Sequence, residues 1–276
     1  NTLRELARLK VFYVLVIFAG IIIGSSAVVA RLSFQQEFQV LKDISLGAIG
    51  ICTSLLAIIA TARLLPQDLE DRTLYSILAK PVSRFEYLAG KLSGVLLLLA
   101  ISTIALAACL FVALYLREQA AIADATRQFS AARGAEMTDA VREIHQATFT
   151  ASLAAAVAMI FIKSATLAAI TLAISTFATT NIFSVAIATS VYFIGHLQGT
   201  AREYWLQEQA GGWTARAFLG IVALVFPDLQ QFNFADEVVA GAAIPLALFL
   251  KTTVLAGFYI LFYLMLSAAV FAQREL

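Results

Sequence analysis

The stretch LSGVLLLLAISTIALAACLFVALYL, residues 92–116, decides the fold class, because it carries no charged side chain from end to end. The hydrocarbon core of a bilayer is about 30 Å thick, so about 20 consecutive apolar residues can cross it as a helix. Further apolar stretches lie at about residues 11–30, 44–62, 150–178, 181–196 and 248–271. The sequence therefore predicts an all-α integral membrane protein with six transmembrane helices.

Composition excludes several classes of function. The chain is 61% hydrophobic and 13% charged, whereas soluble domains are about 45–50% apolar and about 25% charged. It has no basic arm with interleaved aromatic residues, which excludes nucleic-acid binding. Cys52 and Cys109 lie in apolar runs without metal-binding spacing, so we expect small buried side chains and no metal site, the alternative being a metal or redox pair.

No motif of a catalytic site occurs in the sequence. The phosphate-binding pattern G-x-x-x-x-G-K-[ST] and the nucleophile pattern G-x-S-x-G are both missing. We therefore expect no catalytic residues in this chain and no ATP hydrolysis by the chain alone.

Polar segments divide the chain, residues 1–276, into the parts of a single transmembrane domain. Residues 117–148 hold four arginines and predict a helical segment outside the bilayer, broken at Gly134. Residues 197–247 are irregular, and their apolar run 217–226 is too short to span, which favours a re-entrant or interfacial helix. Trp205 and Trp213 precede this run, as is typical of the headgroup layer.

The distribution of positive charge predicts that both termini are cytoplasmic, because cytoplasmic loops are enriched in Lys and Arg. The short polar loop expected at residues 31–43, on the other side, holds only Arg31 and Lys42. The basic residues on the side of the termini are Arg4, Arg8, Lys10, Arg63, Arg72, Lys80, Arg84, Lys91 and Arg274.

The most informative polar segment is the loop RLLPQDLEDRTLYSILAKPVSRFEYLAGK, residues 63–91. Pro66 suits the first turn of a helix, and the acidic residues that follow favour its N-terminus. Pro81 ends this helix, because the residue before proline avoids α geometry. Ser83 and Glu86 then form a capping box that starts a helix running into the third span. Two readings follow from these features: an amphipathic helix that anchors the bundle to headgroups, or a docking element for a soluble partner.

This loop resembles the signature of ABC-2 type transporter permeases. The resemblance rests on Glu70, Thr73-Leu74, Ile77-Leu78, Pro81-Val82-Ser83-Arg84 and Gly90-Lys91. Many family members have Gly where this chain has Arg72, and the Arg72-Thr73 pair is similar to the subgroup associated with multicopper-enzyme maturation. The basic start and the six-span layout extend the resemblance loosely over the whole chain.

The resemblance implies a coupling helix at 66–79 that docks on a cytoplasmic ABC ATPase dimer, with ATP and Mg bound by that ATPase and no cofactor in this chain. It implies a second permease copy, identical or not, and export of a substrate across the bacterial cytoplasmic membrane. The alternative is a force-transducing assembly factor that acts on a periplasmic partner through 117–148 without moving a solute. The implied ATPase-coupling residues are Asp68, Glu70, Asp71, Arg72, Thr73, Leu74, Tyr75, Leu78, Pro81 and Arg84.

Lys163 lies inside the fourth predicted span, where a charge costs roughly 3 kcal/mol and marks a functional candidate. Ser164 and Thr171 lie near it on a small, weakly polar face, and the three residues define a candidate translocation path. Snorkelling or pairing with a neighbouring helix is the alternative for Lys163, and helix packing is the alternative for the two hydroxyls. The two histidines, His145 and His196, lack metal-binding spacing, so we expect surface or interfacial polar residues.

Overall fold

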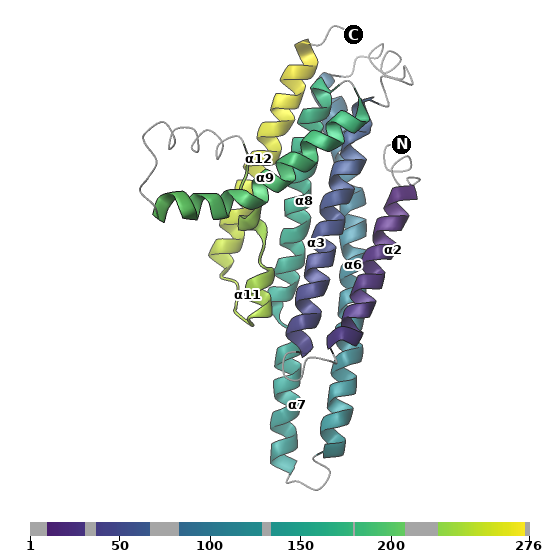
Figure 1. Ribbon diagram of the computed structural model, residues 1–276, viewed down its shortest axis with the longest axis vertical. Helices are drawn as coiled ribbons and strands as arrows, with labels where there is room; N and C mark the ends of the chain where they lie inside the picture. The colour runs from purple at the N-terminus through teal and green to yellow at the C-terminus, as the bar shows by residue number, and fades with distance from the viewer. Residues whose placement is uncertain are drawn as a thin grey trace.

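A computed structural model of the chain describes residues 10–30, 37–66, 83–128, 134–178, 180–207 and 226–273, and every regular element in these ranges is helical. Long helices form an elongated bundle, and two short elements pack at its side (Figure 1). In chain order the elements are α2 (Lys10–Ala30), α3 (Glu37–Ala62), α6 (Arg84–Gln128), α7 (Gly134–Thr148), α8 (Ala151–Phe177), α9 (Asn181–Gln207), η1 (Leu229–Phe232), α11 (Ala235–Val239) and α12 (Leu246–Gln273).

Helix α8 lies at the centre of the bundle. It packs against α3, α6, α9 and α12. A helix that is apolar on all sides is typically buried, and α8 combines large apolar residues with small ones such as Ala165, Ala168 and Ala169, all of which are buried. Small residues allow helices to approach closely in a membrane, which explains how one helix contacts four others.

Within the described ranges, five helices are long and apolar enough to cross a membrane by length and composition. They confirm an all-helical, multi-pass membrane protein. The remaining predicted span, at residues 11–30, corresponds to α2. Its apolar stretch, Phe12–Val28, is shorter than the other five, and its crossing of the membrane stays a prediction. Helix α9 differs from the other four, because it runs obliquely across the bundle rather than along it (Figure 1).

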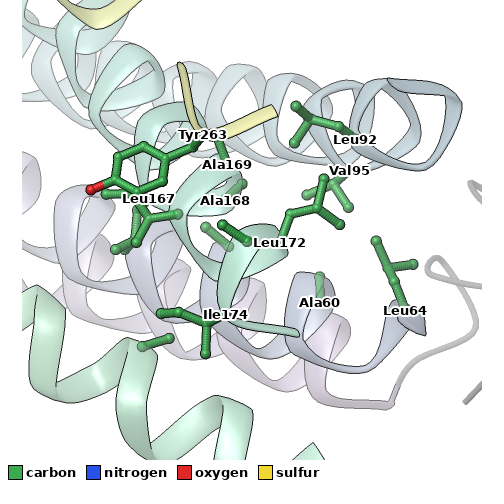
Figure 2. Packing of buried hydrophobic residues seen from close by; sticks show 14 of the residues in the cluster. Ala60, Leu64, Leu92, Val95, Leu167, Ala168, Ala169, Leu172, Ile174 and Tyr263 are labelled. Atoms are coloured by element: carbon green, nitrogen blue, oxygen red, sulfur yellow. The ribbon is translucent and has the colours of Figure 1, made fainter. Parts of the chain in front are cut away.

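Among the described residues, the bundle interior contains two apolar clusters, one toward each end. The cluster near the end of α12 joins α3, α6, α8, α9 and α12, and Figure 2 shows Leu172 of α8 packed beside Val95 of α6. The other cluster joins the first halves of α3 and α8 to η1 and α11. The fold is therefore held by apolar packing along its whole length.

Large apolar side chains also cover the outside of the bundle. Val254 and Met265 of α12 are 72% and 67% exposed, and Ile17 and Ile21 of α2 are more than half exposed. Soluble proteins rarely expose contiguous apolar patches of this kind. These faces are suited to contact with lipid.

The start of α2, the end of α3, the start of α6 and the end of α12 share one end of the bundle (Figure 1). Figure 1 shows the start of α2 and the end of α12 at this end. Helix α3 runs toward this end and α6 runs away from it, so the described residues on both sides of 67–82 lie here.

Two predicted polar loops are shorter than expected. Residues 37–43 belong to α3, not to the loop predicted at 31–43, and residues 197–207 belong to α9, not to the irregular segment predicted at 197–247. The polar side chains of the first segment find partners inside the fold: Glu37 pairs with Arg117, and the Lys42 ammonium donates to the carbonyl of Ala147 at 2.6 Å. Because these groups are satisfied, the helix continues beyond the apolar stretch.

The predicted break at Gly134 is observed, because α6 ends at Gln128 and α7 begins at Gly134. The second half of α6 and α7 form an antiparallel hairpin that extends past the end of the bundle opposite the termini (Figure 1). At its base the exposed His145 ring donates to the buried Glu118 carboxylate at 2.6 Å. This contact joins the two helices of the hairpin to each other, whereas the Arg117–Glu37 ion pair and the hydrogen bond from Lys42 to Ala147 join the hairpin to α3.

Candidate functional site

The residues expected to dock on an ATPase fall mainly outside the described residues. This applies to Asp68, Glu70, Asp71, Arg72, Thr73, Leu74, Tyr75, Leu78 and Pro81, which lie in the segment 67–82. Of that set, Arg84 is described, together with the helix ends on both sides of the segment. These two attachment points, the end of α3 and the start of α6, form the first part of the candidate site.

The start of α6 has the capping geometry that the sequence predicts. The Ser83 hydroxyl accepts a hydrogen bond from the backbone N–H of Glu86 at 3.2 Å, and the Glu86 carboxylate accepts one from the backbone N–H of Ser83 at 3.0 Å. This reciprocal pair satisfies two N–H groups that a helix terminus leaves open. The segment 67–82 therefore ends at a sharply defined residue.

Arg84 links this helix start to the last turn of α12. Its Nη1 donates to the carbonyls of Phe271 and Ala272 at 2.8 and 2.6 Å, and its guanidinium lies 5.9 Å from the centre of the Phe271 ring. The last carbonyls of a helix lack partners within the helix and carry its negative dipole end, so an arginine there is favourable. Tyr87, one turn further on, stacks on the same ring at 6.1 Å.

At the other side of the segment, the end of α3 is fixed by apolar burial. Leu64 and Leu65 are almost fully buried and belong to the same apolar cluster as Leu88 of α6 and Phe271 of α12. Both attachment points of residues 67–82 thus lie in one packed unit. A displacement of either helix end is opposed by contacts with the other two helices.

The second part of the candidate site is a buried polar group between α8 and α9. Lys163 is only 7% exposed, and its ammonium lies 2.9 Å from Nε2 of His196 and 5.8 Å from the centre of the Tyr192 ring. His196 Nδ1 lies 3.1 Å from the backbone carbonyl of Tyr192. Among the described residues, no carboxylate forms an ion pair with Lys163.

The contacts of this group allow the tautomer of the imidazole to be assigned when Lys163 is an ammonium. A lysine ammonium has three donors and no acceptor, so His196 Nε2 must accept and Nδ1 must carry the proton that is donated to Tyr192. We therefore assign His196 as the neutral imidazole and Lys163 as the charged partner. The sequence singled out Lys163 but expected His196 at a surface or interface; the structure half-buries His196 against Lys163.

Ser164 and Thr171, the other residues of the candidate translocation path, are fully buried on α8. Ser164 donates to the carbonyl of Ile160 at 2.7 Å, and Thr171 donates to the carbonyl of Leu167 at 2.8 Å. Their hydroxyls therefore bond within their own helix, whereas Lys163 reaches across to α9.

The turn after residue 226 closes over α9 beside this polar group. A Cβ atom at Gly195 would lie 2.7 Å from Cγ of Leu229 and 3.0 Å from the Pro227 carbonyl oxygen. Such distances are below ordinary van der Waals contact, so the glycine is required for η1 to approach this closely. Nothing in the local sequence pattern indicates this contact, because its two sides lie in different elements.

The model for the ABC-2 family transporter protein family matches residues 4–201, which is well over half of the chain. No curated protein matches this sequence.

Proposed function

The chain belongs to the ABC-2 transporter family, and we propose that it couples ATP hydrolysis by a separate ATPase subunit to export of a substrate. Membership makes the chain a multi-pass membrane permease of an ABC system, and such a permease is not itself catalytic. We further propose that it acts with a second permease copy in the bacterial cytoplasmic membrane. The Arg72-Thr73 pair supports the subgroup associated with multicopper-enzyme maturation.

The observation that carries the coupling proposal is the attachment of residues 67–82. The segment leaves α3 at a buried leucine pair and enters α6 at a capped turn tied to α12 by Arg84. A protein that merely rested on headgroups would need only an amphipathic helix. A rigid three-helix attachment is suited to passing a displacement from a soluble partner into the bundle.

In the proposed mechanism, ATP binding closes the two ATPase subunits, and the coupling helix at 66–79 moves with them. Because α6 is bonded to the last turn of α12, the start of α6 and the end of α12 move together. The displacement then reaches α8 through the apolar cluster that contains all three helices. Lys163, Ser164 and Thr171 on α8 are proposed to line the path that this movement opens.

The test is to replace Glu70 and Arg72 by alanine together and to measure recruitment and stimulation of the ATPase in the copurified complex. We expect reduced recruitment or reduced stimulation of ATP hydrolysis, because the docking surface loses one charge of each sign. The matched control replaces Asp139 and Arg142 of α7, which removes the same two charge types from the hairpin at the opposite end of the bundle. Equal recruitment and stimulation by the native and the Glu70/Arg72 variant proteins would refute the assignment.

The force-transducing alternative is favoured by one observation, the α6–α7 hairpin that projects beyond the bundle (Figure 1). In that case the hairpin would position or pull a periplasmic protein. Deletion of residues 120–146 separates the two functions. A solute exporter should keep ATPase stimulation and some transport, whereas a mechanical device should lose its partner.

A further inference from the structure

An open cavity of about 720 Å³ lies between η1, α11 and the first turns of α12, and none of the site residues described above lines it. Its walls differ in character. The wall from η1 and α11 presents the polar side chains of Gln230, Asn233 and Glu237, and the wall from α12 presents Lys251, Val254 and Phe258. The cavity is therefore polar on one side and mainly apolar on the other.

The wall from α12 continues as a track of exposed apolar side chains. Lys251, Val254 and Phe258 are spaced by three and four residues, so they share one face of the helix. Val254, Phe258 and Met265 are 72%, 60% and 67% exposed. At about 1.5 Å per residue, Val254 and Met265 lie about 16 Å apart along the axis, close to the roughly 15 Å of hydrocarbon in one leaflet.

Two opposite charges stand at the head of this track. Lys251 is on α12 and Glu237 is on α11, and both side chains are exposed. In the described part of the chain, neither forms an ion pair. A ligand that carries an anion and a cation close together would complement both, and an attached apolar chain would cover the track.

We propose that this cavity binds a phospholipid with an ethanolamine headgroup. The phosphate would lie at Lys251, and the primary ammonium would lie at Glu237, with one acyl chain along α12 from Val254 toward Met265. An ethanolamine ammonium has three N–H donors that a carboxylate and the neighbouring amide oxygens can accept, whereas a choline headgroup has none. The site goes beyond the proposed transport function and does not depend on it.

The first test uses the native full-length protein in detergent, titrated with dioleoyl phosphatidylethanolamine, phosphatidylcholine or phosphatidylglycerol and followed by native mass spectrometry. We expect phosphatidylethanolamine to bind at least tenfold more tightly than phosphatidylcholine. Soluble glycerophosphoethanolamine should not displace it at equal concentration, because it lacks the chain that covers the track. Equal binding of the three lipids, or displacement by the soluble headgroup, would overturn the proposal.

Variants then locate the site. Glu237→Gln should weaken phosphatidylethanolamine binding about tenfold and leave phosphatidylglycerol binding unchanged, and Lys251→Met should weaken both. The matched controls are Asp236→Asn, an exposed carboxylate next in sequence that does not line the cavity, and Arg142→Met on α7. If the controls reduce lipid binding as much as the cavity variants do, the lipid is not held at this cavity.

Discussion

The buried contact between Lys163 and His196 gives a sharp energetic prediction, because it joins a charge to a neutral acceptor inside the bundle. His196→Leu removes the acceptor and leaves the ammonium buried without it. A hydrogen bond to a charged group is worth about 1.5–3 kcal/mol, so we expect the variant to lose about that much stability. Lys163→Met removes a charge whose burial at the centre of a span costs roughly 3 kcal/mol. This gain in stability offsets most of the stability lost with the hydrogen bond and the cation–π contact.

The combined variant therefore should be more stable than His196→Leu alone. In a double-mutant cycle the two substitutions should show a coupling of about 1.5–3 kcal/mol, because residues in direct contact are not additive. The measurement is the midpoint of unfolding by SDS in mixed micelles, converted to free energies with the slope of each transition. The cation–π contact between Lys163 and Tyr192 is present in both the native protein and His196→Leu, so it does not contribute to the difference in stability between these two proteins.

A coupling below about 0.5 kcal/mol would refute the contact, because distant sites add within that margin. The same proteins also separate stability from function. If Lys163 lines the translocation path, Lys163→Met should lose transport while its unfolding midpoint stays close to that of the native protein. Loss of transport only in the destabilised His196→Leu variant would assign the pair to packing alone.

Two further predictions concern packing and the helix junction. Gly195→Ala should be about 1–3 kcal/mol less stable than Gly199→Ala in the same unfolding assay. A Cβ atom at Gly195 meets the buried Leu229 and a backbone carbonyl, whereas a Cβ atom at Gly199 meets the end of the exposed Gln230 side chain. Both positions lie in α9, so the gain in helix propensity is shared, and equal stabilities would contradict the close approach of η1. Arg84→Gln should lower stability by about 1–2 kcal/mol, since it loses two partly exposed hydrogen bonds to the end of α12. It should also reduce ATPase stimulation more than Arg84→Lys, which keeps the charge. Unchanged ATPase stimulation in both variants would show that this junction does not take part in coupling.

Local sequence determined much of this protein. The apolar stretches fix the long helices because a bilayer requires runs of about 20 apolar residues, and their positions agree with α3, α6, α8 and α12. The capping box at Ser83 and Glu86 was predicted correctly because all its partners lie within three residues. The break at Gly134 is likewise local.

The contacts that build the candidate site were decided by the tertiary structure. Arg84 meets Phe271, Lys163 meets His196, and Gly195 meets Leu229, and each pair joins different elements. Hydrophobic periodicity says which residues avoid water, but in a membrane nearly every face of a helix is apolar, so the pattern does not select which faces meet. That choice depends on small residues, on the few buried polar groups and on the path of the chain between helices, which only the folded arrangement brings together.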